Sequence, residues 1–228
     1  MGSFFLYSRN VAPDLLRFFR GTGADAAAAP APKAVARSQR SSSGLKEFSK
    51  SIGPESPRVV LDLGPTSPMN LMRLTGMGHK VYNEDLLMTS LDPRYQVKGQ
   101  DGGLELSPQE FFKESLVFDE GALDAVLAWD VADYLPEPLV KPMVDRLHRA
   151  LKPGGVLLGF FHTREAGPEA PYHRYHITGA ETLDVQVVER FKLARVFNNR
   201  HIENLFHDFR SVKFFLARDH FREVLVVR

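Results

Sequence analysis

The sequence predicts an α/β protein whose sheet is mostly parallel and ends in an antiparallel hairpin. Beyond residue 45, apolar runs of strand length alternate with segments of helical period, a pattern that favours a parallel sheet. Early in this alternation, the apolar run 58–62 leads into a turn rich in glycine and proline that opens a helix. Near the C-terminus, segments 211–217 and 221–227 are separated by only three residues, and so short a connection requires antiparallel pairing.

The elements between these landmarks follow from their periodicity and end signals. We expect the remaining strands near residues 58–62, 79–83, 124–129 and 155–161. We expect helices near residues 45–51, 68–76 and 138–151, and a short capped helix from Asn198 to Phe206. The apolar triplet Leu116-Val117-Phe118 indicates a further short strand. Together these elements supply enough apolar residues for one core and one domain, 44–228.

The first 43 residues differ in composition from the rest. Residues 1–21 include a short amphipathic segment after Asp14, which predicts a helix that docks on the body, on a partner or on a membrane surface. Residues 22–43 are rich in Ala, Pro, Ser and Arg and have too little apolar surface to form a core, so we expect a low-complexity linker.

The overall composition excludes several classes of function. Lys and Arg total 29 against 28 Asp and Glu, so charge gives no indication of nucleic-acid binding. The chain has no cysteine, which excludes disulfides and thiolate chemistry and is consistent with a reducing compartment. No apolar run approaches the roughly 18 residues needed to span a bilayer. We therefore expect a soluble, cytoplasmic protein without a transmembrane segment.

Two motifs carry a resemblance to a known family. Val59-Val60-Leu61-Asp62-Leu63-Gly64 and, about ninety residues later, Leu151-Lys152-Pro153-Gly154-Gly155 are similar to segments of the class I S-adenosylmethionine (SAM)-dependent methyltransferases of type 11/12. The resemblance covers roughly residues 55–228. It implies a Rossmann-like class I methyltransferase sheet, mostly parallel with a C-terminal antiparallel hairpin, and SAM as the cofactor.

The first of these motifs is degenerate. Where the family has an acidic residue and a Gly-x-Gly-x-Gly-like turn, this chain has Asp62, Gly64, Thr66 and Pro68, so only the first glycine is present. Thr66 adds a branched side chain, and Pro65 and Pro68 each remove an N–H donor. Ser67 before Pro68 is good helix-capping chemistry, so the strand–turn–helix should form. The hydroxyls of Thr66 and Ser67 are candidates to replace lost donors, and a well-capped turn without a ligand is the alternative.

The resemblance also implies residues on two neighbouring strands. An acid at the end of the second strand holds the ribose in the family, and Glu84 and Asp85 are the candidates here, with Asp85 favoured by its spacing. Two exposed loop carboxylates are the alternative. At the end of the fourth strand, Trp129 and Asp130 are expected at the cleft floor, with Asp130 contacting the methionine portion or a substrate. Capping of the next turn is the alternative for Asp130.

The segment after the fifth strand is expected to be a loop over the acceptor pocket. It holds many titratable and aromatic groups: His162, Arg164, Glu165, Tyr172, His173, Tyr175 and His176. A catalytic base from this loop remains open, and no catalytic residue is assigned. Three histidines alone suggest a metal, but no carboxylate or cysteine completes a ligand spacing, so we expect none.

Two functions therefore follow from the sequence. The first is a SAM-dependent methyltransferase that acts on an unidentified small-molecule or protein acceptor. The second is a methyltransferase-fold protein that has lost catalysis and serves as a binding or scaffold module. The missing glycines favour the second, whereas Gly64, the acids and Trp129-Asp130 favour the first.

Overall fold

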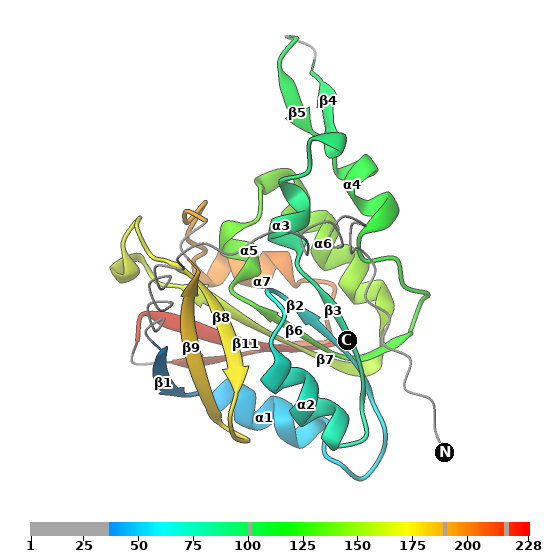
Figure 1. Ribbon diagram of the computed structural model, residues 1–228, viewed down its shortest axis with the longest axis vertical. Helices are drawn as coiled ribbons and strands as arrows, with labels where there is room; N and C mark the ends of the chain where they lie inside the picture. Colours follow the sequence, from blue (N-terminus) through cyan, green and yellow to red (C-terminus); the bar gives the residue numbers. More distant parts are fainter. Residues whose placement is uncertain (1–36, 100–101, 189–190, 217–218) are drawn as a thin grey trace, which may run out of the picture.

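The centre of the molecule is a six-stranded sheet (Figure 1). The computed structural model describes residues 37–99, 102–188, 191–216 and 219–228. The sheet has the order β10-β11-β7-β6-β2-β3. Its strands are β2 (Val59–Leu63), β3 (Lys80–Glu84), β6 (Leu123–Trp129), β7 (Leu151–His162), β10 (Ser211–Leu216) and β11 (Phe221–Val227). The first four are parallel, whereas β11 runs antiparallel to both β7 and β10. The predicted fold class and its C-terminal hairpin are thereby confirmed.

Helices cover both faces of this sheet. Successive residues of each strand point to opposite faces, so a strand with apolar residues throughout contributes side chains to a core on each face. On β2, Val60 joins the core beneath the first two helices, whereas Leu61 and Leu63 join the core on the other face. The first face is covered by α1 (Ser43–Ser51) and α2 (Pro68–Gly76). The second is covered by α3 (Leu86–Ser90), α4 (Pro108–Glu114), α5 (Val131–Tyr134), α6 (Glu137–Ala150) and α7 (Asn199–Leu205). All four predicted helices are present within two residues of their expected bounds.

Two smaller sheets are added to this body. One is antiparallel with the order β1-β9-β8 and consists of β1 (Arg37–Ser41), β8 (Tyr172–Ile177) and β9 (Thr182–Val188). The other is the hairpin of β4 (Gln96–Lys98) and β5 (Leu104–Leu106), which projects at the top of Figure 1. Short 3₁₀ turns are η1 (Pro93–Tyr95) and η2 (Arg164–Ala166). In the part of the chain that the structure describes, no helix is both long and apolar enough to cross a bilayer.

The linker prediction is wrong for its last residues. Residues 37–41 form β1, which pairs with β9 along its whole length. The composition does not reveal this strand, because its anchor is one polar side chain. The Arg40 guanidinium donates to the Glu223 carboxylate at 2.6 Å and lies over the rings of Phe160 and Phe221. The predicted N-terminal helix and the linker before residue 37 lie outside the described residues.

Two further local predictions are corrected. Residues 116–118 form no strand; Leu116 instead has a left-handed backbone (φ 52°), and its N–H donates to Glu84. The segment after β7 is not a simple loop, because residues 172–177 form β8 in the small sheet. This segment pairs with β9 along its whole length, which gives backbone groups of both strands their partners. This strand brings its side chains against the ends of β2 and β6.

Candidate functional site

The candidate site lies at the carboxyl ends of β2 and β6. The chain passes from β2 to β3 on one side, whereas β6 lies on the other side of β2, so the order reverses between β2 and β6. Open α/β sheets bind ligands outside the carboxyl ends of the strands at such a switch point. The segments at these ends are the turn Gly64–Ser67 and the pair Trp129-Asp130, which are the segments that the sequence indicates.

The turn after β2 has the expected strand–turn–helix geometry and is braced by Asn83 of β3. Ser67 Oγ caps α2 by accepting from Asn70 N–H at 3.2 Å, and Pro68 begins the helix. The Asn83 amide donates to the carbonyl oxygens of Asp62 and Gly64, and Thr66 Oγ1 donates to Asn83 Oδ1. Ser67 Oγ is also 2.8 Å from His176 Nδ1. The two hydroxyls that we expected to replace missing donors are therefore already bonded inside the protein.

Asp62 is buried beneath this turn with both carboxylate oxygens bonded. Trp129 Nε1 donates to Oδ1 at 2.6 Å, and Asn70 Nδ2 donates to Oδ2 at 2.9 Å. Burial raises the pKa of Asp62 to about 6, and the hydrogen bonds from Asn70 and Trp129 act against this rise. Asn70 also donates to the Tyr175 carbonyl and accepts from Ile177 N–H, so it joins β8 to α2.

Gly64 faces an unpartnered hydroxyl across the turn. A Cβ built on Gly64 would lie 3.4 Å from Trp129 Cδ1 and 3.5 Å from Tyr172 Oη, which are ordinary contacts. Gly64 is not among the described residues with positive φ, so its backbone suits any residue. Tyr172 is fully buried, and its hydroxyl has no hydrogen-bond partner among the described residues. The fold thus requires neither the glycine nor the hydroxyl here.

The two acids at the end of β3 are partly buried and lie next to the turn. Gly64 N–H donates to the Glu84 carbonyl at 3.0 Å, which joins the two strand ends. The Glu84 carboxylate accepts from Leu116 N–H, and the Asp85 carboxylate caps α3 by accepting from Met88 N–H. Burial raises the pKa of both carboxyls. The alternative of two exposed loop carboxylates is therefore wrong.

Trp129 and Asp130 end β6 in a strained conformation. Trp129 has φ 46°, which is unfavourable for a bulky residue, and its ring stacks on Tyr175 at 4.9 Å. Asp130 is fully buried; its Oδ2 accepts from Tyr175 Oη at 3.0 Å and lies 3.4 Å from His173 Nδ1. The side chain of Asp130 makes no capping bond to the following helix, so the capping alternative is wrong. Asp130 instead faces β8.

The remaining candidates from the segment after β7 divide into two groups. His162 lies at the end of β7, where its Nδ1 is 2.9 Å from Asp133 Oδ2. His176 bonds Ser67 and lies 3.3 Å from Gln186 Oε1, and burial lowers its pKa. Arg164 and Glu165 fall in η2. Sequence reasoning missed Asn70 and Asn83, since nothing in their spacing separates them from ordinary helix and strand residues.

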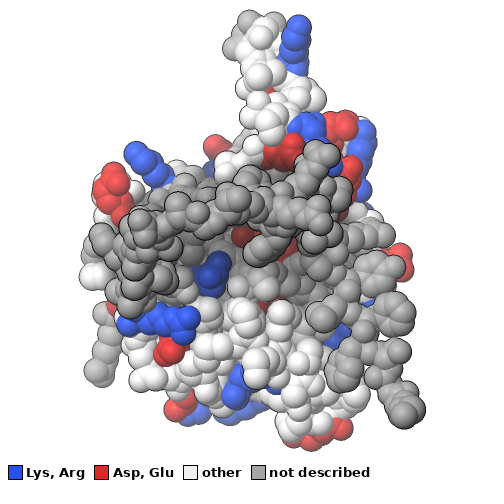
Figure 2. Space-filling view, in the orientation of Figure 1, with Lys and Arg blue, Asp and Glu red and all other residues white. Residues whose placement is uncertain are grey.

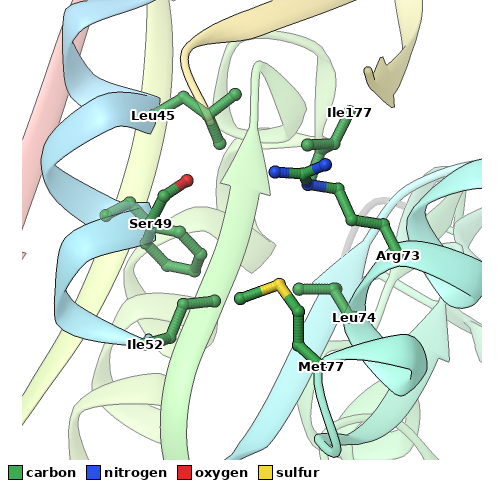
Figure 3. Close-up of a pocket in the computed structure, with 8 residues that line it drawn as sticks. Leu45, Ser49, Ile52, Arg73, Leu74, Met77 and Ile177 are labelled. Carbon is green, nitrogen blue, oxygen red and sulfur yellow. The ribbon is translucent and has the colours of Figure 1, made fainter. Parts of the chain in front are cut away.

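A small cavity between α1 and α2 is not a ligand site. Figure 3 shows Leu45 and Ser49 of α1, with Ile52 just after it, facing Arg73 of α2, and Met77 just after that helix, across the cavity. Its volume is about 20 Å³. Such a space holds about one water molecule, whereas pockets for small ligands measure about 300–1,000 Å³.

On the face in Figure 2, the described Lys and Arg residues lie among Asp and Glu, so neither charge gathers there.

Comparison with known proteins finds distant structural likenesses only. No family model matches the chain, and no curated protein matches it. One similar structure is the 1,6-didemethyltoxoflavin-N1-methyltransferase of Burkholderia thailandensis, with S-adenosylhomocysteine bound: 15% identity, 82% of this chain, 78% of that chain, TM-score 0.43. A SAM-dependent methyltransferase of Aquifex aeolicus is also similar, with 13% identity over 80% of this chain and 88% of that chain and a TM-score of 0.44. Another, of Archaeoglobus fulgidus, has 10% identity over 81% of this chain and 91% of that chain and a TM-score of 0.46. At such identities and TM-scores these likenesses support no conclusion about chemistry, and the fold assignment rests on the strand order.

Proposed function

We propose that this protein binds SAM at the turn between β2 and α2 and acts as a class I SAM-dependent methyltransferase on an unidentified acceptor. The observation that carries the proposal is the pair formed by Gly64 and Tyr172 at the switch point of the sheet. Gly64 has a backbone conformation open to any residue and room for a Cβ, so the fold gives no reason for a glycine. A ligand that packs against the backbone gives such a reason.

The unpartnered hydroxyl of Tyr172 supports the same conclusion. A buried hydroxyl without a partner is costly, by about 1–3 kcal/mol, and native proteins rarely leave one. Tyr172 Oη lies 3.5 Å from the Cβ position of Gly64, so a ligand packed against the Gly64 backbone would lie near this hydroxyl. A polar group of a bound ligand would satisfy this hydroxyl. The residues present therefore fit a ligand that has both a surface for close backbone contact and hydrogen-bonding groups, as SAM has.

The acids at the end of β3 supply the second half of the proposed site. Asp85 and Glu84 follow the strand that pairs with β2, and Gly64 is hydrogen-bonded to the backbone of Glu84. Asp85 has one carboxylate oxygen on Met88 N–H and is the better candidate for the ribose hydroxyls. Bound SAM supplies an electrophilic methyl group. The chain would hold and orient the ligand, and the aromatic rings of Trp129, Tyr172 and Tyr175 would keep water from it.

A second candidate function is a binding or scaffold protein without catalysis. One specific observation favours it: the polar groups of the turn are already bonded within the protein. Both oxygens of Asp62 accept hydrogen bonds, from Trp129 and Asn70, and the hydroxyls of Thr66 and Ser67 are used. Pro65 and Pro68 offer no N–H donor. A cytoplasmic location is part of both proposals, supported by the absence of cysteine.

Calorimetric titration with SAM and S-adenosylhomocysteine tests the proposal. We expect the native protein to bind both, and Gly64→Ala to lose binding by at least tenfold, because its methyl group occupies the approach to the turn. The free energy of unfolding of Gly64→Ala should change by less than about 0.5 kcal/mol, because its Cβ meets only ordinary contacts. Gly76→Ala is the matched control, since a Cβ there meets nothing within 4 Å.

The outcomes separate the two functions. Binding by the native protein and by Gly76→Ala, but not by Gly64→Ala, supports SAM recognition at this turn. No heat at millimolar SAM favours the scaffold, whereas equal binding by Gly64→Ala contradicts SAM recognition at this turn. Once binding is established, formation of S-adenosylhomocysteine on incubation with pooled acceptors separates an enzyme from a binding protein.

A further inference from the structure

Three potential metal ligands meet where β6, β7 and β8 come together. Asp130 follows β6, His162 ends β7 and His173 lies on β8. One potential ligand atom from each residue lies within 4.8 Å of the other two. Asp130 and His162 are buried, and the side chain of His173 is 13% exposed. The linear spacing of these residues is not that of any ligand motif, which is why the sequence alone indicates no metal site.

We propose that Asp130, His162 and His173 bind a divalent transition-metal ion of the zinc, cobalt or iron type. Two imidazoles and one carboxylate are ligands that suit these ions. Three protein ligands are also the number found in catalytic zinc sites, where a fourth position stays open for water or substrate. The proposal assigns Asp130 to the metal and not to the methionine portion of SAM, and its test does not require SAM to bind.

The carboxylate of Asp130 has a free, buried oxygen. Tyr175 Oη donates to Oδ2, which holds the orientation of the carboxylate. Oδ1 is buried and has no hydrogen-bond partner among the described residues. A buried carboxylate oxygen without a partner costs free energy, and the described protein groups offer no donor for it. A cation bound to Oδ1 would remove this cost.

The environment of His162 sets the ring up as a ligand through Nε2. The Asp133 carboxylate accepts from the His162 backbone N–H at 2.6 Å, and its Oδ2 is 2.9 Å from ring Nδ1. A carboxylate only accepts, so Nδ1 carries a proton and Nε2 of a neutral ring is free. Carboxylate–histidine pairs of this kind fix the tautomer and orientation of metal-bound histidines. Asp133 is therefore a positioning residue and not a ligand.

The hydroxyl of Tyr134 does not use this lone pair. Tyr134 Oη lies 3.4 Å from His162 Nε2, but it donates its hydrogen to the Ala170 carbonyl at 2.9 Å. In a neutral His162, the lone pair of Nε2 therefore accepts no hydrogen bond from Tyr134. The rival arrangement is a doubly protonated His162 that pairs with Asp133 and donates to Tyr134. That arrangement accounts for His162 but leaves Asp130 Oδ1 without a partner.

Titration of the full-length protein with Zn²⁺ and Co²⁺, after removal of metal with a chelator, tests the proposal. We expect one equivalent of Zn²⁺ to bind by calorimetry. One equivalent of Co²⁺ should give visible absorption and quench the emission of Trp129, the single tryptophan of the chain and the neighbour of Asp130. His173→Gln and Asp130→Asn should weaken binding at least tenfold. Asp133→Asn should weaken it about 10–100-fold and leave the visible spectrum of the bound Co²⁺ unchanged, because the ligands remain.

The control is His79→Gln. His79 is a buried histidine outside the cluster, and its Nε2 is hydrogen-bonded to the Ile52 carbonyl. It should bind Zn²⁺ and Co²⁺ as the native protein does. Thermal unfolding shows whether each variant is still folded. Zn²⁺ should raise the unfolding midpoint temperature of the native protein and of His79→Gln, but not that of His173→Gln. The proposal is overturned if the native protein binds no Zn²⁺ or Co²⁺ at micromolar concentration. Binding that is equal in His173→Gln and the native protein overturns it as well.

Discussion

Two buried polar networks lie side by side at the carboxyl edge of the sheet, and they differ in completeness. Around Asp62, every polar atom of the Asp62 and Asn70 side chains that points inward has a partner. Around Asp130 and Asp133, one oxygen of each carboxylate has no partner within the described part of the chain, and neither has the hydroxyl of Tyr172. The strand β8 contributes to both networks.

The difference separates a structural role from a functional one. A complete network in a region of low dielectric is stabilising and rigid, so the Asn70 contacts serve to attach the small sheet to α2. An incomplete buried network is costly in isolation, and in native proteins it marks a place where a water, an ion or a ligand is expected. Both proposals above, SAM beside Gly64 and a metal beside Asp130, fall on the incomplete side.

The largest expected effect is the removal of Asn70. Asn70→Ala should lower the free energy of unfolding by about 3–5 kcal/mol, because three buried polar groups lose their Asn70 partner: Asp62 Oδ2, the Tyr175 carbonyl and the Ile177 N–H. Chemical denaturation monitored by circular dichroism measures this change.

The matched control is Asn204→Ala. Asn204 is exposed in α7, so the same substitution in a helix should change the free energy of unfolding by less than about 0.5 kcal/mol. If Asn70→Ala costs no more than Asn204→Ala, the complete network does not hold the small sheet.

The titration of Asp62 should produce the next largest effect. Its pKa is about 6 in the folded protein and 3.8 ordinarily, so the folded state favours the protonated form. The stability from Asp62 is then fully present below pH 4 and is lost as the pH rises through about 6, by roughly 2–3 kcal/mol. Trp129 donates to this carboxylate and is the only tryptophan, so its emission should change with a midpoint near pH 6.

Asp62→Asn removes the titrating group and serves as the control for this emission change. A native midpoint near pH 4 would show that burial does not perturb Asp62. A change that persists in Asp62→Asn would assign the emission to another group.

The main sheet was predictable because its strands follow local rules. The run 59–63 and its capped helix, the stop signal after α6 and the short C-terminal connection each determine structure over a few residues. The strand β1 was not predictable, since its composition is that of a linker. The strand forms because Arg40 reaches Glu223, 183 residues away in sequence. A contact of that range leaves no local pattern.

The candidate site shows the same division. Gly64, Asp85 and Trp129 could be named as candidates because each lies at the end of a strand that the sequence reveals. The contacts of these residues with Tyr172 and Tyr175 were not predicted, because both tyrosines were expected in a loop and instead lie on β8, which pairs with β9. The cluster of Asp130, His162 and His173 needed the register of three strands, so spacing in the sequence could not reveal it.

The smallest expected effect sharpens the comparison within β8 itself, where two buried tyrosines differ in one hydrogen bond. Tyr172→Phe should leave the free energy of unfolding unchanged or raise it by up to about 1 kcal/mol, because its hydroxyl is buried without a described partner. Tyr175→Phe should lower it by about 1.5–3 kcal/mol, since its hydroxyl donates to the Asp130 carboxylate. Urea denaturation of both variants measures the difference.

If Tyr172→Phe is as costly as Tyr175→Phe, then the Tyr172 hydroxyl has a partner in the free protein, and it no longer marks a place for a ligand. If Tyr172→Phe is stable but binds SAM more weakly than the native protein, the hydroxyl serves the ligand and not the fold.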